Sequence, residues 1–470
     1  MDQSKVLLKS TLVYTIGNIG SKIITFCLLP VFTFYLNKSD LGKYDLMLNT
    51  ISLLVPFVNL QISDAVYRWL IESKGDEEIK KKAITNGLVV VTVSTLLFIG
   101  LFWIVNQFVH FEFSVYFIFI LVVSCYFPFL QQLIRGLGKG NLYSLVGIIN
   151  ALLIAFVNAF FLIFVKNGVS GLFIALILAN AVSIGFIVYS LKLNRFVSLD
   201  LFDLGEAKKM LSYSWPLIPN MISWWLISTI DRYIILYFLN TDANGIYAVS
   251  TRFPAIITVI NSVFLLAWQD HAVVNESKTD FVSNTFRKYI IFEFSLIFLL
   301  IAGSRFMVEY FIDARYLESW QYMPFLYLGV AFSSFAAYVG VGYQKERKTV
   351  GIFVTTLVGT VVNIIISSVL INYIGLFGPG IGVFVSFFLV YLIRLKETKS
   401  FFPVHVDNVL FFSLLFTAFL IMGLSFLDNK LFNVLAVVIA VGLSLYLNRE
   451  LIRKIVLKGK VMLKSKVNYN

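Results

Sequence analysis

Apolar residues occur along this chain in about fourteen stretches of about twenty residues, separated by short polar turns. A helix of that length crosses a hydrocarbon core of roughly 30 Å. Ten-residue segments of alternating polarity, typical of membrane β-barrels, are absent from the sequence. The pattern therefore predicts helical spans at 8–36, 45–70, 83–106, 113–134, 142–165, 169–191, 212–239, 246–270, 288–311, 322–343, 350–372, 379–395, 406–427 and 431–448.

Composition places these helices in lipid. Hydrophobic residues make up 59% of the 470 residues and charged residues 14%, and the mean hydropathy is +0.85. These values are typical of a polytopic membrane protein and not of a large soluble core. The first stretch is not a cleavable signal peptide, because its apolar region is too long and it lacks a small-residue cleavage site. We predict an all-α polytopic membrane protein with about 14 transmembrane helices.

The distribution of positive charge predicts the orientation. If the N-terminus is cytoplasmic, most of the 38 Lys and Arg fall in inner loops and in the basic tail after residue 448. The positive-inside rule then puts both termini in the cytoplasm, and Ser39 and Asn244 outside. The tail is expected to lie on anionic headgroups rather than to bind nucleic acid. The predicted location is the inner, cytoplasmic membrane of the cell.

Sequence motifs give no indication of an enzyme. Cys27 and Cys125 both fall inside spans, so we expect neither a disulfide nor a metal cluster. No zinc-protease, Walker-type or serine-hydrolase motif is present. Hydrolysis of nucleotides and serine chemistry therefore have no visible machinery, and no cofactor is expected.

An internal repeat with an offset of about 203 residues relates two halves of the chain. Four positions of one outer turn (Leu36, Asn37, Gly42, Tyr44) match four of another (Leu239, Asn240, Gly245, Tyr247). Three further matches follow in the same order. The repeat unit is six spans, an even number, so the two copies are related by a pseudo-twofold axis along the membrane normal. We predict an N-lobe (1–200), a C-lobe (201–400), two further helices (401–448) and a cytoplasmic tail (449–470).

Polar residues in the first spans of each half form helical faces. On the second span they recur at steps of three and four residues, which places them on one side of a helix. The repeat carries the pattern into the second half. Such faces predict a cavity between the repeats, lined by Asn18, Asp45, Asn49, Asn59, Ser63, Trp224 and Trp225.

Three basic residues, Lys22, Arg232 and Arg252, lie within spans. A cation in the bilayer costs roughly 2.5 to 3.5 kcal/mol on insertion scales, so it usually faces a functional interior. Few carboxylates oppose these three, which favours an anionic ligand such as phosphate. The alternatives are snorkelling of the two arginines, or a structural pair of Lys22 with Asp64 or Glu293. Asp231 points away from Arg232 on a regular helix.

Prolines cluster in the first two spans of each half and predict kinks at which a cavity opens and closes. The candidate hinge residues are Pro30, Pro56, Pro216, Pro219 and Pro254. About half of these prolines can be explained instead as kinks that serve only helix packing.

The run from Ser228 to Phe253, with the segment "RGLGKGNLY" from Arg135, resembles the Wzx-type polysaccharide flippases of the multidrug, oligosaccharidyl-lipid and polysaccharide exporter superfamily. The resemblance implies that an undecaprenyl-pyrophosphate-linked oligosaccharide is flipped by alternating access, for O-antigen, capsule or exopolysaccharide synthesis. Membrane lipids, a polysaccharide polymerase and chain-length machinery are the other implied partners. It also implies H⁺ or Na⁺ coupling in some relatives, for which the candidate residues are Asp45, Asp64, Asp231 and Glu293.

Two rival functions remain open at this stage. A cation-coupled multidrug antiporter of the same superfamily would share the fold, but it should present carboxylates to cationic drugs. A membrane glycan polymerase or glycosyltransferase should carry a large catalytic outer loop. The longest outer loop here, near residues 313–322, has about ten residues.

Overall fold

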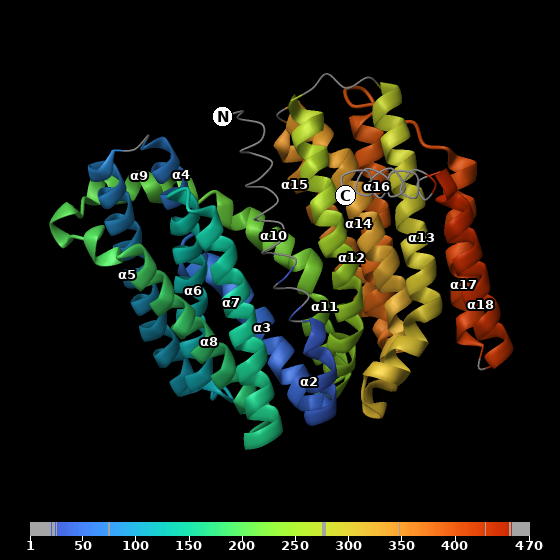
Figure 1. Cartoon of the computed structure of the whole chain (residues 1–470), viewed down its shortest axis with the longest axis horizontal. Helices are drawn as coiled ribbons and strands as arrows, with labels where there is room; N and C mark the ends of the chain where they lie inside the picture. Colours follow the sequence, from blue (N-terminus) through green and yellow to red (C-terminus); the bar gives the residue numbers. More distant parts are fainter. Residues whose placement is uncertain are drawn as a thin grey trace, which may run out of the picture. The chain divides into compact units, whose positions relative to one another are not determined.

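The computed structural model describes residues 20, 24, 26–73, 76–274, 279–346, 348–427, 429–450 and 453, and the described chain is helical. It divides into two compact units, Met1–Ala248 and Val249–Asn470. The first unit holds α2 (Leu29–Tyr35), α3 (Lys38–Val58), α4 (Ile62–Glu72), α5 (Glu77–Phe108), α6 (Ser114–Gly136), α7 (Gly140–Phe160), α8 (Gly168–Leu191), α9 (Leu204–Ser214), α10 (Leu217–Thr229) and α11 (Asp231–Phe238) (Figure 1).

Helix α12 (Thr241–Val274) begins in the first unit and continues into the second. The second unit then holds α13 (Thr279–Phe311), the 3₁₀ segment η4 (Ala314–Tyr322), α14 (Met323–Lys345), α15 (Thr349–Ile374), α16 (Phe377–Thr398), α17 (Asn408–Phe426) and α18 (Lys430–Leu447). The compact units part at residue 248, whereas the repeat-based lobes part near residue 200. Helices α9 to α11, assigned to the second lobe by the repeat, thus lie in the first unit.

Eleven described helices are long and apolar enough to cross a membrane, or twelve if the bent pair α3 and α4 is one span. The chain is therefore a multi-pass membrane protein, with fewer described spans than the fourteen predicted. Most of the first predicted span lies outside the described residues. The seventh, at 212–239, is not one long helix, because α10 and α11 are separate short helices that meet at Ile230.

The second predicted span is broken rather than continuous. Helices α3 and α4 meet at an angle of 54°, with Leu60 and Gln61 both in the left-handed region. Pro56 removes a backbone donor one turn before the break. The Asn59 side chain accepts from the Gln61 amide, and Ser214 donates to the Leu60 carbonyl. These two hydrogen bonds stabilise a backbone conformation that non-glycine residues rarely adopt.

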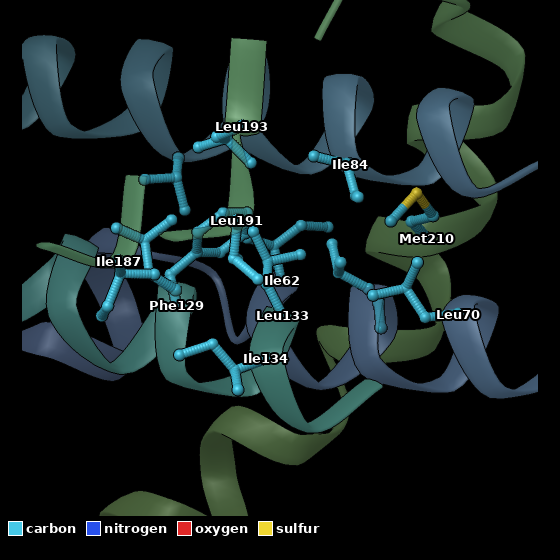
Figure 2. Close-up of a cluster of buried hydrophobic side chains, with 14 of the residues drawn as sticks. Ile62, Leu70, Ile84, Phe129, Leu133, Ile134, Ile187, Leu191, Leu193 and Met210 are labelled. Carbon is cyan, nitrogen blue, oxygen red and sulfur yellow. The ribbon is translucent and has the colours of Figure 1, made fainter. Parts of the chain in front are cut away.

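The first unit has one large apolar core (Figure 2). It joins α4, α5, α6, α8 and α9 through fully buried side chains such as Ile62, Ile84, Phe129, Ile187 and Met210. At its polar end, Asp203 caps α9 and forms an ion pair with Lys82 at 3.0 Å. The hydrogen bond from Lys82 lowers the pKa of the half-buried Asp203 carboxyl.

The repeated turn motif around Asn37 and Asn240 has the same structural role in both copies. Asn37 accepts a hydrogen bond from the Asp40 amide at the start of α3, and Asn240 accepts one from the Ala243 amide at the start of α12. Both asparagines are helix N-caps, which satisfy otherwise unpaired backbone donors.

The two motif glycines pack reciprocally. A methyl group on Gly42 would overlap the Thr241 carbonyl, and one on Gly245 would overlap the Lys38 carbonyl. The N-terminal turns of α3 and α12 thus approach at backbone contact, as small residues permit between membrane helices.

Cysteines at two exposed positions test the orientation, in a background that lacks Cys27 and Cys125. Ser39 is half-buried and Asn244 buried, so neither suits labelling. Asn167 and Asp200 are exposed, and the charge distribution puts them outside and inside. With an impermeant maleimide on intact cells whose outer barrier is breached, we expect Asn167→Cys to react and Asp200→Cys to be protected. The reverse pattern would overturn the assignment.

Candidate functional site

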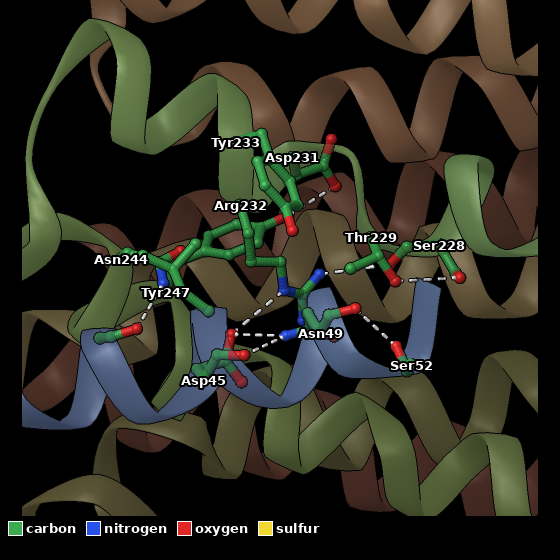
Figure 3. Close-up of polar contacts among 12 residues, drawn as sticks. Asp45, Asn49, Ser52, Ser228, Thr229, Asp231, Arg232, Tyr233, Asn244 and Tyr247 are labelled. Atoms are coloured by element: carbon green, nitrogen blue, oxygen red, sulfur yellow. Dashed lines mark hydrogen bonds and ion pairs between the residues drawn. The ribbon is translucent and has the colours of Figure 1, made fainter. Parts of the chain in front are cut away.

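A polar cluster in the first unit surrounds an ion pair between α3 and α11 (Figure 3). Arg232 donates through Nε to Oδ2 of Asp45 at 3.4 Å, and the two side chains are only 12% and 8% exposed. Asn49, one turn after Asp45, donates to the same oxygen at 3.0 Å. The cation and the carboxylate predicted from sequence therefore meet, although 187 residues separate them.

Arg232 also has partners on its own side of the cluster. Its guanidinium donates to the Ser228 carbonyl at 3.2 Å and lies 5.4 Å from the centre of the Tyr247 ring, a cation–π distance. The Tyr247 hydroxyl donates to Asp231 at 3.1 Å. Asp231 is thus a buried neighbour that engages Tyr247. The cluster fixes the guanidinium by an ion pair, a carbonyl and an aromatic face.

Helices α10 and α11 also form hydrogen bonds with the polar face of α3. Trp225 donates through Nε1 to the Asn49 carbonyl at 3.0 Å and to the Ser52 hydroxyl at 2.9 Å. Tyr233 and Thr50 share a hydrogen bond of 2.6 Å. These bonds join the polar face of α3 to α10 through Trp225 and to α11 through Tyr233, so the predicted polar face of the second span meets the seventh.

The break after α3 changes the role of two predicted residues. Asn59 is the C-terminal cap of α3, and its side chain accepts a hydrogen bond from the Gln61 amide in the turn. Ser63 lies beyond the bend, on α4. The predicted face is therefore continuous only through Asp45, Asn49 and Ser52. Lys22 and Asn18 lie outside the described residues. Trp224 lies on α10.

The other candidate acidic and basic residues are spread over both units. Asp64 on α4 accepts from Gln132 at 3.3 Å. In the second unit, Arg252 lies half-buried on α12. Glu293 on α13 is fully buried beside Asn261 and Tyr289, and neither of its oxygens forms a hydrogen bond of ordinary geometry among the described residues. Such a carboxyl needs a bound proton or cation to offset its burial.

The candidate hinge prolines mark helix ends as often as helix interiors. Pro30 lies in the first turn of α2, Pro216 is the N-cap of α10 and Pro219 lies in the first turn of α10. Pro56 and Pro254 lie inside α3 and α12.

Arg394 is a buried cation at the end of the twelfth predicted span, 379–395, where the sequence did not mark it as a site residue. It lies within α16 and is 4% exposed. It donates to Thr355, to Thr356 and to the Ala336 and Ile352 carbonyls, and so joins α14, α15 and α16. The available signal was a basic residue between two apolar residues at the end of an apolar span, one turn before α16 ends at Thr398. Tyr247 and Tyr233 were also missed, because tyrosines are common throughout the spans.

A family model described as "Polysaccharide biosynthesis protein" matches residues 7–268, which is more than half of the chain. The chain belongs to this polysaccharide biosynthesis protein family. The Wzx-type resemblance seen in the sequence is thereby confirmed, and the matched region includes the whole Asp45–Arg232 cluster.

Solved structures of several transporters show the same fold. The lipid II flippase MurJ, in an inward closed conformation, has a TM-score of 0.72 at 14% identity, covering 95% of this chain and 100% of that one. An inward-facing multidrug resistance MATE family transporter of the MOP superfamily has a TM-score of 0.63 at 14% identity, covering 83% and 95%. A mutant of the Vibrio cholerae MATE transporter VcmN gives 0.60 at 12% identity, covering 85% and 98%. A search of curated proteins found no match.

Proposed function

We propose that this family member is a flippase that moves an undecaprenyl-pyrophosphate-linked oligosaccharide across the cytoplasmic membrane by alternating access. The observation that carries the proposal is the Arg232 guanidinium, whose side chain is only 12% exposed and which lies within the region matched by the family model. Surface polysaccharide synthesis requires a polar, anionic lipid head to cross an apolar barrier. A fixed cation in a water-poor site supplies the counter-charge for that step.

The long Asp45 contact suits exchange with a phosphate. At 3.4 Å, the pair is longer than a typical charge-assisted hydrogen bond of about 2.7 to 2.9 Å. A pyrophosphate presents several oxygens, which match the planar guanidinium fork. The substrate's phosphates thus compete with Asp45 for Arg232, with Lys22 and Arg252 as further cations.

Polar side chains around Arg232 suit the sugar part of the substrate. Asn49, Ser52 and Trp225 offer hydrogen-bonding groups and an aromatic face on α3 and α10. Asn18, Asn59, Ser63 and Trp224 complete the proposed set. The prenyl chain remains among membrane lipids, and the product passes to a polymerase and chain-length machinery.

Acidic residues are the proposed sites of H⁺ or Na⁺ coupling. Asp45 and Asp231 contact Arg232 and Tyr247 respectively, so a cation that binds either group alters the arginine's surroundings. Glu293 and Asp64 are the candidates outside this cluster. Since Asp45 and Asp231 already have partners, the cluster gives a cationic drug no dedicated carboxylate, which favours the flippase over the drug antiporter.

Substitution of Arg252 tests the function. We expect Arg252→Ala to lower export of surface polysaccharide by about 10- to 150-fold, the loss expected for a charge-assisted hydrogen bond. Arg252→Lys should restore only part of the export, because a point charge does not reproduce a bidentate fork. The measurement is surface polysaccharide in a deletion strain complemented with each variant, with membrane levels checked by immunoblot.

Arg305→Ala is the matched control, because Arg305 lies on α13 and pairs with Glu309 at a half-exposed position. It should export normally. A parallel assay in proteoliposomes compares a fluorescent lipid-linked oligosaccharide with a cationic dye. Transport of the dye alone, or full export by the Ala variants of Lys22, Arg232 and Arg252, would contradict the proposal.

A further inference from the structure

The second unit contains a cleft of about 380 Å³ between α13, α17 and α18, separate from the Arg232 cluster. Its walls include Arg287 and Lys288 on α13 and Tyr446 near the end of α18, with Arg449 just beyond it. The charge distribution assigns this end of the helices to the cytoplasmic side. The cleft therefore lies where one leaflet's headgroups meet the protein.

The rim of the cleft is cationic. Arg287, Lys288 and Arg449 are exposed, and within the stretches that the structure describes none of the three forms an ion pair with a carboxylate. Glu450 is the one carboxylate on the rim, so the rim keeps a net positive charge. The Arg449 guanidinium lies 4.8 Å from the centre of the Tyr446 ring, which holds it beside the cleft.

Part of the cleft lining is apolar. Ile291 lies one helical turn, about 5.4 Å, beyond Arg287 toward the middle of the span. Phe292, Leu410 and Leu447 complete this part of the wall. A cationic rim above an apolar wall matches a molecule with an anionic head and an acyl chain, and a soluble anion would leave the apolar part unused.

The walls of the cleft are fixed by hydrogen bonds between α13 and α18. Ser444 donates to the Ser295 carbonyl at 3.0 Å, and Asn448 donates to the Ser295 hydroxyl at 2.8 Å. These bonds hold the end of α18, and with it Arg449, against α13. The cleft is thus a preformed site whose rim need not be ordered by the ligand.

We propose that this cleft binds an anionic glycerophospholipid, with the headgroup phosphate at Arg287, Lys288 and Arg449 and an acyl chain along Ile291 and Leu410. Each cation near a membrane surface contributes roughly a fivefold gain in affinity for anionic lipid. Bound lipid bridges α13 and α18, so it should also raise the thermal stability of the protein.

The test measures binding of phosphatidylglycerol to the purified full-length protein, by native mass spectrometry and by thermal unfolding in detergent. Phosphatidylethanolamine with the same acyl chains is the zwitterionic comparison. We expect phosphatidylglycerol to bind more tightly and raise the unfolding temperature. We expect Arg287→Ala/Lys288→Ala to weaken that binding about 25-fold without changing the unfolding temperature in the absence of lipid, because both side chains are exposed.

The control is Lys396→Ala/Lys399→Ala, which removes two exposed cations at the end of α16 in the same unit. It should bind phosphatidylglycerol like the unmodified protein. An equal loss in the control would show general attraction to negative charge and overturn the site. Equal binding of both lipids would do the same. Displacement by inorganic phosphate or by glycerophosphoglycerol would show a soluble-anion site, and displacement by lipid-linked oligosaccharide would assign the cleft to the substrate; either result would overturn the proposal.

Discussion

Replacing Gly245 with alanine is expected to hold apart the N-terminal turns of α3 and α12 and to stop polysaccharide export. The added methyl group would overlap the Lys38 carbonyl, a backbone atom that cannot rotate away. Overpacking of this kind costs roughly 1–3 kcal/mol, which lowers the population of the packed arrangement about 5- to 150-fold. Gly42→Ala should act alike, because it meets the Thr241 carbonyl.

A disulfide measures the packed arrangement directly. The Ser39 and Thr241 hydroxyl oxygens are 3.1 Å apart, so Ser39→Cys/Thr241→Cys, in a background without Cys27 and Cys125, should crosslink readily. The crosslink should stop export and reduction should restore it, because alternating access requires these outer ends to separate. A cysteine pair at Leu36 and Leu239, which the repeat identifies as counterparts, would test the same separation of helix ends. Adding Gly245→Ala should slow crosslinking.

Gly185→Ala and Gly100→Ala are the matched controls, since no atom lies within 4 Å of a methyl group added at either position. Both should crosslink and export normally. A Gly245→Ala protein that crosslinks at the unmodified rate would show that the two turns tolerate a methyl group. A crosslinked protein with full export would show that these ends do not gate, and the two-lobe mechanism would have to be given up.

Loss of the Arg232 side chain is expected to abolish export for two separable reasons. Arg232→Gln leaves Asp45 buried without its ion-pair partner, and breaking a buried pair from one side costs roughly 3–5 kcal/mol. We therefore expect reduced thermal stability and a lower membrane level. Adding Asp45→Asn removes the uncompensated charge and should restore stability, yet export should remain absent because the phosphate still lacks its guanidinium.

The double variant distinguishes a structural role from a substrate-binding role. Export in cells and unfolding temperature in detergent are measured for both variants. Arg305→Gln/Glu309→Gln is the control for an exposed pair, worth about 0–1 kcal/mol, and should change neither quantity. Normal export by the Asp45→Asn/Arg232→Gln protein would show that Arg232 only neutralises Asp45.

Local sequence predicted several features of the fold and the site. The apolar runs predicted membrane helices, and the described spans confirm them, except that the second and seventh are broken and most of the first lies outside the described residues. The repeat pointed to Asn37 and Asn240, which are both N-caps. Arg232 was a candidate site residue because it is a cation within a predicted span, and it lies in the polar cluster with Asp45. Each prediction depends on hydrophobicity or on residues within a few positions of one another.

Other features depended on contacts between distant residues. Pro56 signalled a bend, but the left-handed pair Leu60 and Gln61 needs the hydroxyl of Ser214, 154 residues from Leu60. The sequence could not show that Asp45 would be the partner of Arg232, because a carboxylate's partner is set by how helices pack. Arg394 looked like an inner-loop charge, and only the close packing of α14, α15 and α16 makes it a buried donor.

The sequence by itself thus determined that the chain is a helical membrane protein with a repeated turn motif. Lipid imposes the helices locally, since each apolar run must satisfy its own backbone hydrogen bonds. The tertiary structure decided which charges pair, where a span breaks and where two glycines let backbones touch. Those outcomes depend on distances between helices, which hydrophobic periodicity does not encode.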